Sequence, residues 1–272
     1  MKRCLSMGEG CCPMCREIVP AAQRDNLKVS FALRVTIDAL FPPPTPDKII
    51  VDGVDGNHSG EYFGELLDGK RHGSGKMVFT RGLFENIEYS GEWLNDERNG
   101  LGNLYSPDGN LLYAGHWKDD YQHGPGKSYY GLGNMVVEYS GEWVNDKRHG
   151  LGNLYYMNGV LEYEGHIEND KQHGLGKSYY RDGQLQYNGC WASDLPDGEG
   201  KVYDEYGVLR YEGQLKDGNH HGLGQSYSET GGLHYDGQWT DSKRHGLGKL
   251  YLANGQIDYE GYWDNDERRE TL

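Results

Sequence analysis

One short pattern recurs along most of the 272-residue chain: a tyrosine, any residue, a glycine, any residue, and then a tryptophan or an aliphatic residue. Successive copies begin 24 to 27 residues apart, and a Gly-x-Gly pair starts eleven residues after each of the first eight tyrosines. A fixed period of this length is typical of repeat architectures, in which each unit packs against its neighbours. The nine copies begin at Tyr62, Tyr89, Tyr113, Tyr139, Tyr163, Tyr187, Tyr211, Tyr235 and Tyr259.

Within each copy the residues alternate as a β-strand requires. In the segment Tyr89–Trp93 the first, third and fifth residues face one side, and the second and fourth face the other. A turn-rich stretch follows at 95–100, and Asn-Gly or Asp-Gly pairs, which tolerate positive φ, stand where the next turn is expected. We therefore expect one β-hairpin per copy, joined into an antiparallel meander, with no helix after residue 50. The pairs are Asp108-Gly109, Asn158-Gly159, Asp182-Gly183 and Asn254-Gly255.

Glycine is unusually abundant, with 42 residues, while the 9 prolines are an ordinary number. This composition excludes collagen and a disordered Pro-Gly tract, and the 22 tyrosines and 6 tryptophans indicate an ordered chain. A glycine beside large rings lets them lie over the strand, and it also permits a sharp local twist or a bulge. The predicted structural glycines in the central copies are Gly100, Gly102, Gly124, Gly126, Gly150, Gly152, Gly174 and Gly176.

The charge of the chain argues against two classes of partner. The formal charge is −15, and residues 51–272 alone, with 20 basic and 37 acidic side chains, carry −17. Nucleic acids and anionic lipids are bound through lysine and arginine, so we expect no nucleic-acid binding and no strong direct binding to membrane lipid. No stretch approaches the roughly 18 consecutive apolar residues of a membrane-spanning helix.

The number and positions of the five cysteines indicate the redox state of the cellular compartment. Four lie in the first fifteen residues and Cys190 stands apart. An odd, clustered set with one thiol left over favours a reducing environment. We therefore expect an intracellular, cytoplasmic protein.

The Tyr-x-Gly-x-Trp pattern followed by Gly-x-Gly resembles the MORN (membrane occupation and recognition nexus) repeat, over residues 62–272. The resemblance implies an all-β fold, an elongated single-layer antiparallel β-meander, used for protein–protein scaffolding; some members are linked to membranes. Leu66, Ile167 and Leu215 depart from it by replacing the tryptophan. Because the last copy lacks the glycine pair, we expect it to end as one charged edge strand. Residues 48–53 are expected to form an edge strand before the first copy.

The N-terminal segment, which we expect to be short, Cys-rich and partly helical, is similar to another family. Cys12-Pro-Met-Cys15 followed by the apolar run 31–41 resembles the last third of a RING finger, where such a pair supplies zinc ligands and a short helix follows. A complete RING finger needs more ligands than this segment offers. We interpret 1–47 as a degenerate RING-like tail with a short helix and a Pro-rich linker, and 48–272 as the repeat sheet. We expect no metal; a zinc site improvised from the clustered cysteines, or coincidence, stays open. The clustered cysteines are Cys4, Cys11, Cys12 and Cys15.

The rows of aromatic residues are the candidate partner-binding site. Most of these rings are expected to pack the sheet, but a groove lined with rings on a one-layer sheet is also where a helix or peptide would dock. The predicted partner-binding residues are Tyr89, Trp93, Tyr113, Trp117, Tyr139, Trp143, Tyr187, Trp191, Tyr235 and Trp239.

No arrangement of residues indicates catalysis. A histidine precedes the Gly-x-Gly pair in six copies, but residues one hairpin apart, about 10 Å, are too distant to share a metal ion. No glycine pair extends into a phosphate-binding loop, and no nucleophile elbow is present. We expect no catalytic residues, no cofactor and no enzymatic activity.

These observations favour a non-enzymatic scaffold with a protein partner, and a homodimer through an exposed sheet edge is a further possibility. Two alternatives remain open. One is the substrate-recognition arm of a RING-type ubiquitin ligase whose RING is truncated. The other is a membrane-surface tether, which the charge disfavours.

Overall fold

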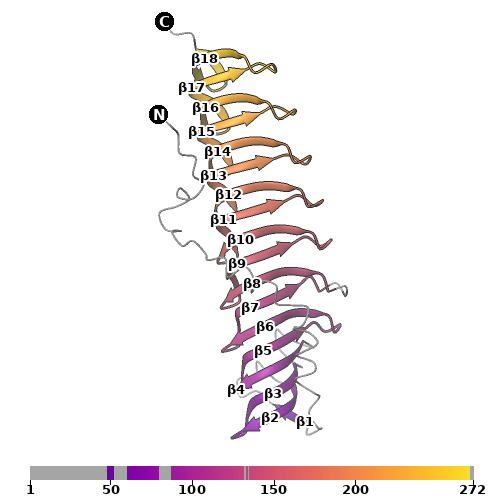
Figure 1. Ribbon diagram of the computed structural model, residues 1–272. Helices are drawn as coiled ribbons and strands as arrows, with labels where there is room; N and C mark the ends of the chain where they lie inside the picture. Colours follow the sequence, from indigo (N-terminus) through magenta and orange to yellow (C-terminus); the bar gives the residue numbers. More distant parts are fainter. Residues whose placement is uncertain (1–47, 52–59, 80–86, 132, 134, 270–272) are drawn as a thin grey trace, which may run out of the picture. The chain divides into compact units, whose positions relative to one another are not determined.

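The computed structural model describes residues 48–51, 60–79, 87–131, 133 and 135–269, with the backbone alone for 48–51. Every helix or strand among them is a β-strand, as the two-residue alternation predicts (Figure 1). The strands fall into two compact units, one ending at Gly159 and the other beginning at Val160. The N-terminal cysteines, the expected short helix and the Pro-rich linker lie outside the described residues.

The first unit is an antiparallel meander in which each strand pairs with the next one in sequence. Its strands are β1 (Lys48–Val51), β2 (Gly60–Leu67), β3 (Lys70–Phe79), β4 (Glu88–Leu94), β5 (Glu97–Tyr105), β6 (Leu111–Lys118), β7 (Tyr121–Tyr129), β8 (Val137–Val144) and β9 (Lys147–Tyr155).

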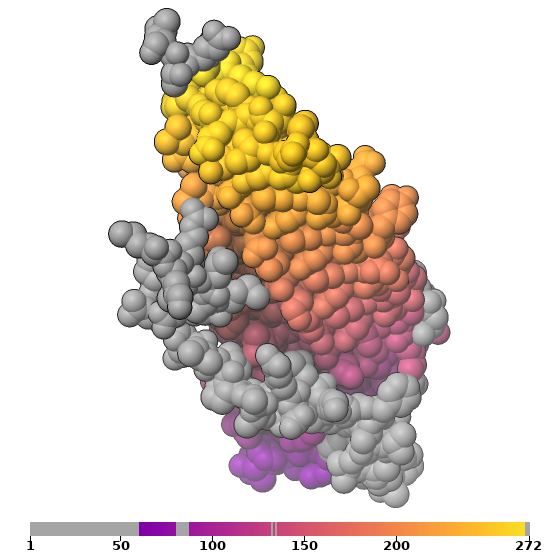
Figure 2. All heavy atoms as spheres, turned by 45° about the horizontal axis from the view of Figure 1, so that its top comes forward, coloured from indigo at the N-terminus to yellow at the C-terminus, as the bar shows by residue number. Residues whose placement is uncertain are grey.

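The second unit repeats this arrangement. Figure 2 shows its side chains as consecutive bands from pink through orange to yellow, so that each repeat lies against the next. Its strands are β10 (Leu161–Glu168), β11 (Lys171–Tyr179), β12 (Leu185–Ala192), β13 (Leu195–Tyr203), β14 (Leu209–Lys216), β15 (Asn219–Tyr227), β16 (Leu233–Thr240), β17 (Lys243–Tyr251), β18 (Ile257–Asp264) and β19 (Glu267–Arg269).

Two-residue turns close the hairpins that carry the repeat motif. Between β4 and β5, Asn95 and Asp96 have φ of 51° and 77°, the combination of a type I′ turn, whose twist matches that of paired strands. Asn and Asp adopt this conformation more readily than other non-glycine residues. The sequence predicted a longer turn at 95–100, but β5 already begins at Glu97, because so short a turn places Glu97 directly opposite Leu94.

Wider turns connect one hairpin to the next, at the predicted Asn-Gly and Asp-Gly pairs. Before β6, the Ser106 amide donates to the Asn110 carbonyl at 2.8 Å and the Gly109 amide donates to the Ser106 carbonyl at 2.9 Å. Gly109 has φ of 77°, which glycine adopts without a steric penalty. The predicted all-β meander of hairpins is therefore confirmed.

The structure confirms the edge strand predicted before the first copy but not the single strand predicted for the last copy. β1 pairs with β2, as expected of an edge strand. The prediction that the last copy ends as a single strand is wrong, because β19 pairs with β18 and places Glu267 opposite Asp264. Its turn, Asn265-Asp266, has the positive φ values of the other tight turns and reverses the chain without a glycine pair.

Candidate functional site

One glycine on each strand from β2 to β9 and from β10 to β18 forms a line across each unit, which we call the glycine line. Gly91 of β4 lies opposite Gly102 of β5, and Gly102 lies opposite Gly115 of β6. The same pairing continues from β2 to β9 and from β10 to β18. The repeat tyrosine covers this line: a Cβ built on Gly102 would lie 2.2 Å from the Tyr89 hydroxyl oxygen. The neighbouring ring therefore requires glycine here.

The hydroxyl of each repeat tyrosine fixes its ring. Tyr89 Oη donates to the Glu92 carbonyl at 3.0 Å, and the other eight bond the carbonyl three residues later at 2.7–3.0 Å. Burial raises the pKa of Tyr62 and of Tyr235 to about 12. These phenols therefore stay protonated and keep donating at neutral pH.

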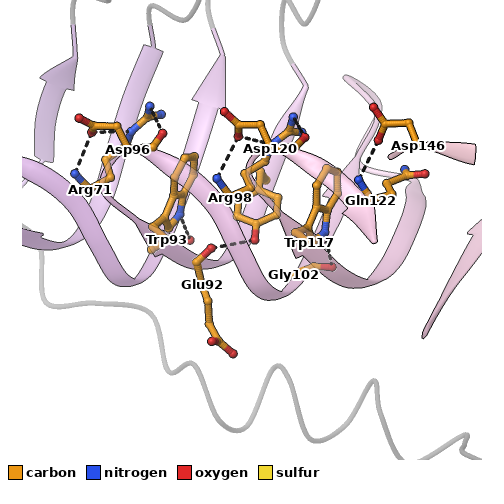
Figure 3. A network of polar contacts seen from close by, with 12 residues as sticks. Arg71, Glu92, Trp93, Asp96, Arg98, Gly102, Trp117, Asp120, Gln122 and Asp146 are labelled. Carbon is orange, nitrogen blue, oxygen red and sulfur yellow. Dashed lines mark hydrogen bonds and ion pairs between the residues drawn. The ribbon is translucent and has the colours of Figure 1, made fainter. Parts of the chain in front are cut away.

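The tryptophan of the motif stands between the tyrosines of adjacent repeats. The Trp117 ring lies 5.3 Å from Tyr89 and 5.2 Å from Tyr113, and both pairs are edge-to-face. Its Nε1 donates to the Gly102 carbonyl at 3.1 Å (Figure 3). Trp93 and Trp239 make the equivalent contacts. Each such tryptophan ties its repeat to the backbone of the preceding one.

A second link between repeats joins an arginine to the tight turn of the next hairpin. Arg98 Nε lies 2.9 Å from Asp120 Oδ1, and Arg98 Nη2 donates to the Asp120 carbonyl at 2.7 Å (Figure 3). The two backbones exchange bonds as well, since the Arg98 amide donates to the Asp120 carboxylate and the Asp120 amide to the Arg98 carbonyl. The guanidinium carbon lies 4.3 Å from the Trp117 ring centroid, a cation–π contact. We call this set of contacts the turn staple.

The turn staple recurs with variations. Arg71 with Asp96 and Arg244 with Asp266 reproduce it. Where glutamine replaces the arginine, the backbone part remains: the Gln122 amide donates to an aspartate carboxylate of the next turn at 2.7 Å (Figure 3). Sequence reasoning missed this link because its partners lie 22 to 25 residues apart.

The predicted structural glycines have two distinct roles. The second glycine of each pair lies on the glycine line beneath a tyrosine, as expected for Gly102, Gly126, Gly152 and Gly176. The first has a left-handed backbone, with φ of 61° to 80° in the four central copies. The first group is Gly100, Gly124, Gly150 and Gly174.

The ten aromatic residues predicted to line a groove are core residues instead. None is more than 8% exposed. Residue alternation shows which side chains share a face, but it does not show that tryptophans and arginines of neighbouring repeats cover that face. The correction concerns Tyr89, Trp93, Tyr113, Trp117, Tyr139, Trp143, Tyr187, Trp191, Tyr235 and Trp239.

The accessible surface is the opposite face of the strands, which we call the outer face. In the second unit it carries one exposed leucine on each of three strands, Leu175, Leu223 and Leu247, with 58%, 61% and 66% of their surface exposed. Two residues further along β11, Lys177 Nζ lies 2.8 Å from a Glu164 carboxylate oxygen. Half-buried tyrosines occupy the next outward position, on strands β5 to β17: Tyr105, Tyr129, Tyr155, Tyr179, Tyr203, Tyr227 and Tyr251.

Neither the histidines nor the cysteines build a metal site in the part of the chain that the structure describes. No group of three or more His, Cys, Asp or Glu residues there is placed to hold an ion. Cys190 is disulfide-bonded, so it is not the leftover thiol on which the expectation of a reducing compartment partly depended. Cys4, Cys11, Cys12 and Cys15 lie outside the described residues.

Comparison with known proteins identifies the repeat. A family model described as MORN repeat matches residues 62–84, 89–111, 113–135, 139–160, 163–185, 187–204, 211–233 and 235–257. These ranges hold eight of the nine copies, and the copy at Tyr259 lies outside them. No curated protein matches the chain.

Proposed function

The chain belongs to the MORN-repeat family, and from this we propose that it is a non-enzymatic scaffold whose repeats bind protein partners. MORN repeats serve in protein and membrane interactions. For this chain we propose protein partners and not lipid, and we propose that they bind to the repeats.

The observation that carries the proposal is the composition of the outer face. Its exposed leucines lie on β11, β15 and β17, beside half-buried tyrosines. Protein interfaces are enriched in tyrosine, and contiguous exposed apolar surface marks binding sites. In the second unit the lysines at the outward position after the leucines are paired, as Lys201 is with Glu212 at 3.0 Å and Lys249 is with Glu260 at 2.9 Å. The face therefore offers apolar and aromatic contact with little unpaired positive charge.

Direct attachment to a membrane has less support. The −17 charge of residues 51–272 repels anionic lipid. The described residues contain no helix with the length and apolar character needed to cross a bilayer. The absence of nucleic-acid binding and a location inside the cell remain predictions from the sequence, and the disulfide at Cys190 argues against the second.

Two narrower ideas remain predictions. The ligase arm depends on residues 1–47, which lie outside the description. A homodimer through a sheet edge would use β1 or β19. The three residues of β19 are charged and exposed, and such an edge resists pairing with another strand.

The test compares the full chain with a variant carrying Leu175→Glu, Leu223→Glu and Leu247→Glu. A protein that co-purifies with the full chain is produced alone and titrated by calorimetry against both. We expect the triple variant to bind at least about tenfold more weakly. Tyr206→Glu is the control, because Tyr206 is 81% exposed in a wide turn away from the outer face. Equal affinity of all three proteins for the partner would refute the role of the outer face.

A further inference from the structure

A row of tyrosines crosses the outer face of the second unit, next to its wide turns. Each ring belongs to the last residue of the second strand of a hairpin, and each is half-buried. One such ring occurs in every repeat, so the rings lie on alternate strands. We call these residues the tyrosine row: Tyr179, Tyr203, Tyr227 and Tyr251.

An aliphatic residue of the following strand lies opposite each ring. Tyr203, for example, lies opposite Leu209 of β14. Directly opposed residues of antiparallel strands place their side chains on the same face. The β-bulge that precedes each of these pairs recurs at the same place, so the alternation of ring and aliphatic group is regular. The residues opposite the rings are Leu185, Leu209, Leu233 and Ile257.

Two of the rings are held by their hydroxyls. Tyr227 Oη donates to Gln225 Oε1 at 2.9 Å, and Tyr179 Oη donates to a Glu164 carboxylate oxygen at 2.8 Å. A side chain that is already fixed loses little conformational freedom when a ligand binds. These rings are therefore prepared for contact.

The lysines beside the row are neutralised. Lys201, two residues before Tyr203, lies 3.0 Å from Glu212, and Lys249, two residues before Tyr251, lies 2.9 Å from Glu260. The strip of rings and aliphatic groups thus has paired charges along its side. Such a surface favours an uncharged ligand.

The spacing of the rings selects the backbone conformation of that ligand. Consecutive rings are two strands apart, about 9.6 Å at a strand spacing of about 4.8 Å. A polyproline II segment turns once in three residues and rises about 3.1 Å per residue, so one side recurs every 9.3 Å or about that. Over the three intervals of the row, the two periods differ by about 1 Å in total.

The other regular conformations fit the row less well. An α-helix presents the same side every seven residues, at about 10.5 Å, and departs from the row by about 3 Å over three intervals. A β-strand presents one side every two residues, at about 6.7 Å, so its side chains miss most of the rings. Polyproline II is therefore the conformation whose period matches the sheet.

We propose that the tyrosine row binds a proline-rich segment of a protein partner in the polyproline II conformation, with every third residue against a ring. The inference rests on the proposed scaffold function and specifies the backbone conformation of the bound segment. Proline suits this surface because it fixes φ before binding and has no amide hydrogen to leave unpaired. Its preformed extended helix docks on aromatic-lined grooves at a low entropic cost.

The test uses the full chain with isotope-labelled tyrosine rings and capped decaproline, whose first, fourth, seventh and tenth residues would meet the four rings. NMR follows the ring signals of Tyr203 and Tyr227, assigned with Tyr203→Phe and Tyr227→Phe, because the first unit carries equivalent rings. We expect saturable shifts, and binding at least about tenfold weaker for capped tetraproline, which spans two rings.

Two further peptides test the conformation. One alternates glycine and proline over ten residues and is therefore flexible; the other is an amphipathic helix with leucine at every seventh position. Both should bind at least about tenfold more weakly than decaproline. No shift with decaproline, or equal binding of any of the other three peptides, overturns the proposal.

Variants of the row identify the site. Tyr203→Ala with Tyr227→Ala should weaken decaproline binding at least about tenfold, measured on the Tyr251 ring, whereas the double phenylalanine variant should bind within about threefold of the unchanged chain. Tyr262→Ala is the matched control, because Tyr262 is 44% exposed near the tight turn of β18 and outside the row. Undiminished binding by the double alanine variant, or an equal loss in the control, overturns the proposal. If the double alanine variant does not fold, the peptide comparison on the unchanged chain still decides.

The titration is independent of the experiment on the exposed leucines. If decaproline does not bind while the triple leucine variant loses its partner, the inference about the tyrosine row fails and the scaffold function stands. If decaproline binds while no protein partner binds the chain, the scaffold function fails.

Discussion

Replacing Gly152 by alanine should be far more costly than the same change at Gly159, although both glycines lie in one repeat. A Cβ on Gly152 would lie 2.3 Å from Tyr139 Cε2 and 2.4 Å from its hydroxyl oxygen. Because Tyr139 is fully buried, its ring has to move. Gly159 has φ of 82° and nothing within 4 Å of a built Cβ.

The magnitude follows from what the ring loses. Forcing extra atoms into a packed core costs about 1–3 kcal/mol. The Tyr139 hydroxyl donates to the Glu142 carbonyl at 2.9 Å, a bond worth about 1 kcal/mol. Its edge-to-face contact with Trp143, at 5.3 Å, adds about 0.5–1.5 kcal/mol. We therefore expect Gly152→Ala to destabilise the repeat by about 3–5 kcal/mol. Gly159→Ala should cost about 1–2 kcal/mol, because its only penalty is that of placing alanine in the left-handed conformation.

Hydrogen exchange is the appropriate assay, because repeats open locally and one global unfolding free energy does not describe them. Loss of protection should concentrate in β8 and β9 for Gly152→Ala. A double-mutant cycle identifies the cause: with Tyr139→Leu in place, Gly152→Ala should cost at least 1 kcal/mol less, roughly the smallest overpacking penalty. Equal costs in the two backgrounds, or equal costs at Gly152 and Gly159, would refute the role given to the ring.

Three further outcomes are expected. Asp120→Ala leaves the half of the turn staple that Arg98 supplies without its acceptor, so it should cost about 2–4 kcal/mol in chemical denaturation, and a cost below 0.5 kcal/mol would contradict the staple. Burial lowers the pKa of His220 in the folded state to about 4, from an ordinary value near 6.5, so its contribution to stability is complete above pH 6.5 and is lost as the pH falls towards 4. His220→Gln should therefore flatten the dependence of the melting temperature on pH between pH 4 and 6.5. Parallel curves for the variant and the unchanged protein would show that His220 is not responsible. The full chain should not sediment with phosphatidylserine vesicles at physiological salt, and salt-sensitive pelleting with acidic but not neutral vesicles would show that its cations outweigh the acidic field.

The hairpin array could be predicted from sequence because its determinants are local. The alternation within Tyr89–Trp93 defines a strand, and pairs such as Asp108-Gly109 define turns. The second glycine of each Gly-x-Gly pair lies beneath the tyrosine of its own copy, as the sequence predicted, because a short fixed interval of thirteen residues places it on the next strand.

The candidate site could not be predicted to the same depth. The burial of Trp117 depends on Tyr89 and Arg98 of the preceding hairpin, and pairing between repeats is not visible in one repeat alone. The replacement of the turn staple at Pro196 does leave a signal, because Pro196, Leu215 and Gly218 replace its arginine, tryptophan and aspartate together. Aligning the copies column by column would have found it; examining each motif separately did not.

The turn staple also makes each repeat depend on a residue that is synthesised after it. Arg98 is synthesised 22 residues before Asp120, the residue that satisfies its side chain and its amide. At about 5–20 residues per second on the ribosome, the turn staple of a repeat can form only about one to a few seconds after its arginine is synthesised. Arg268, in the last repeat, bonds Asp258 of its own hairpin instead. The arginine of this repeat therefore finds its partner in a residue already made.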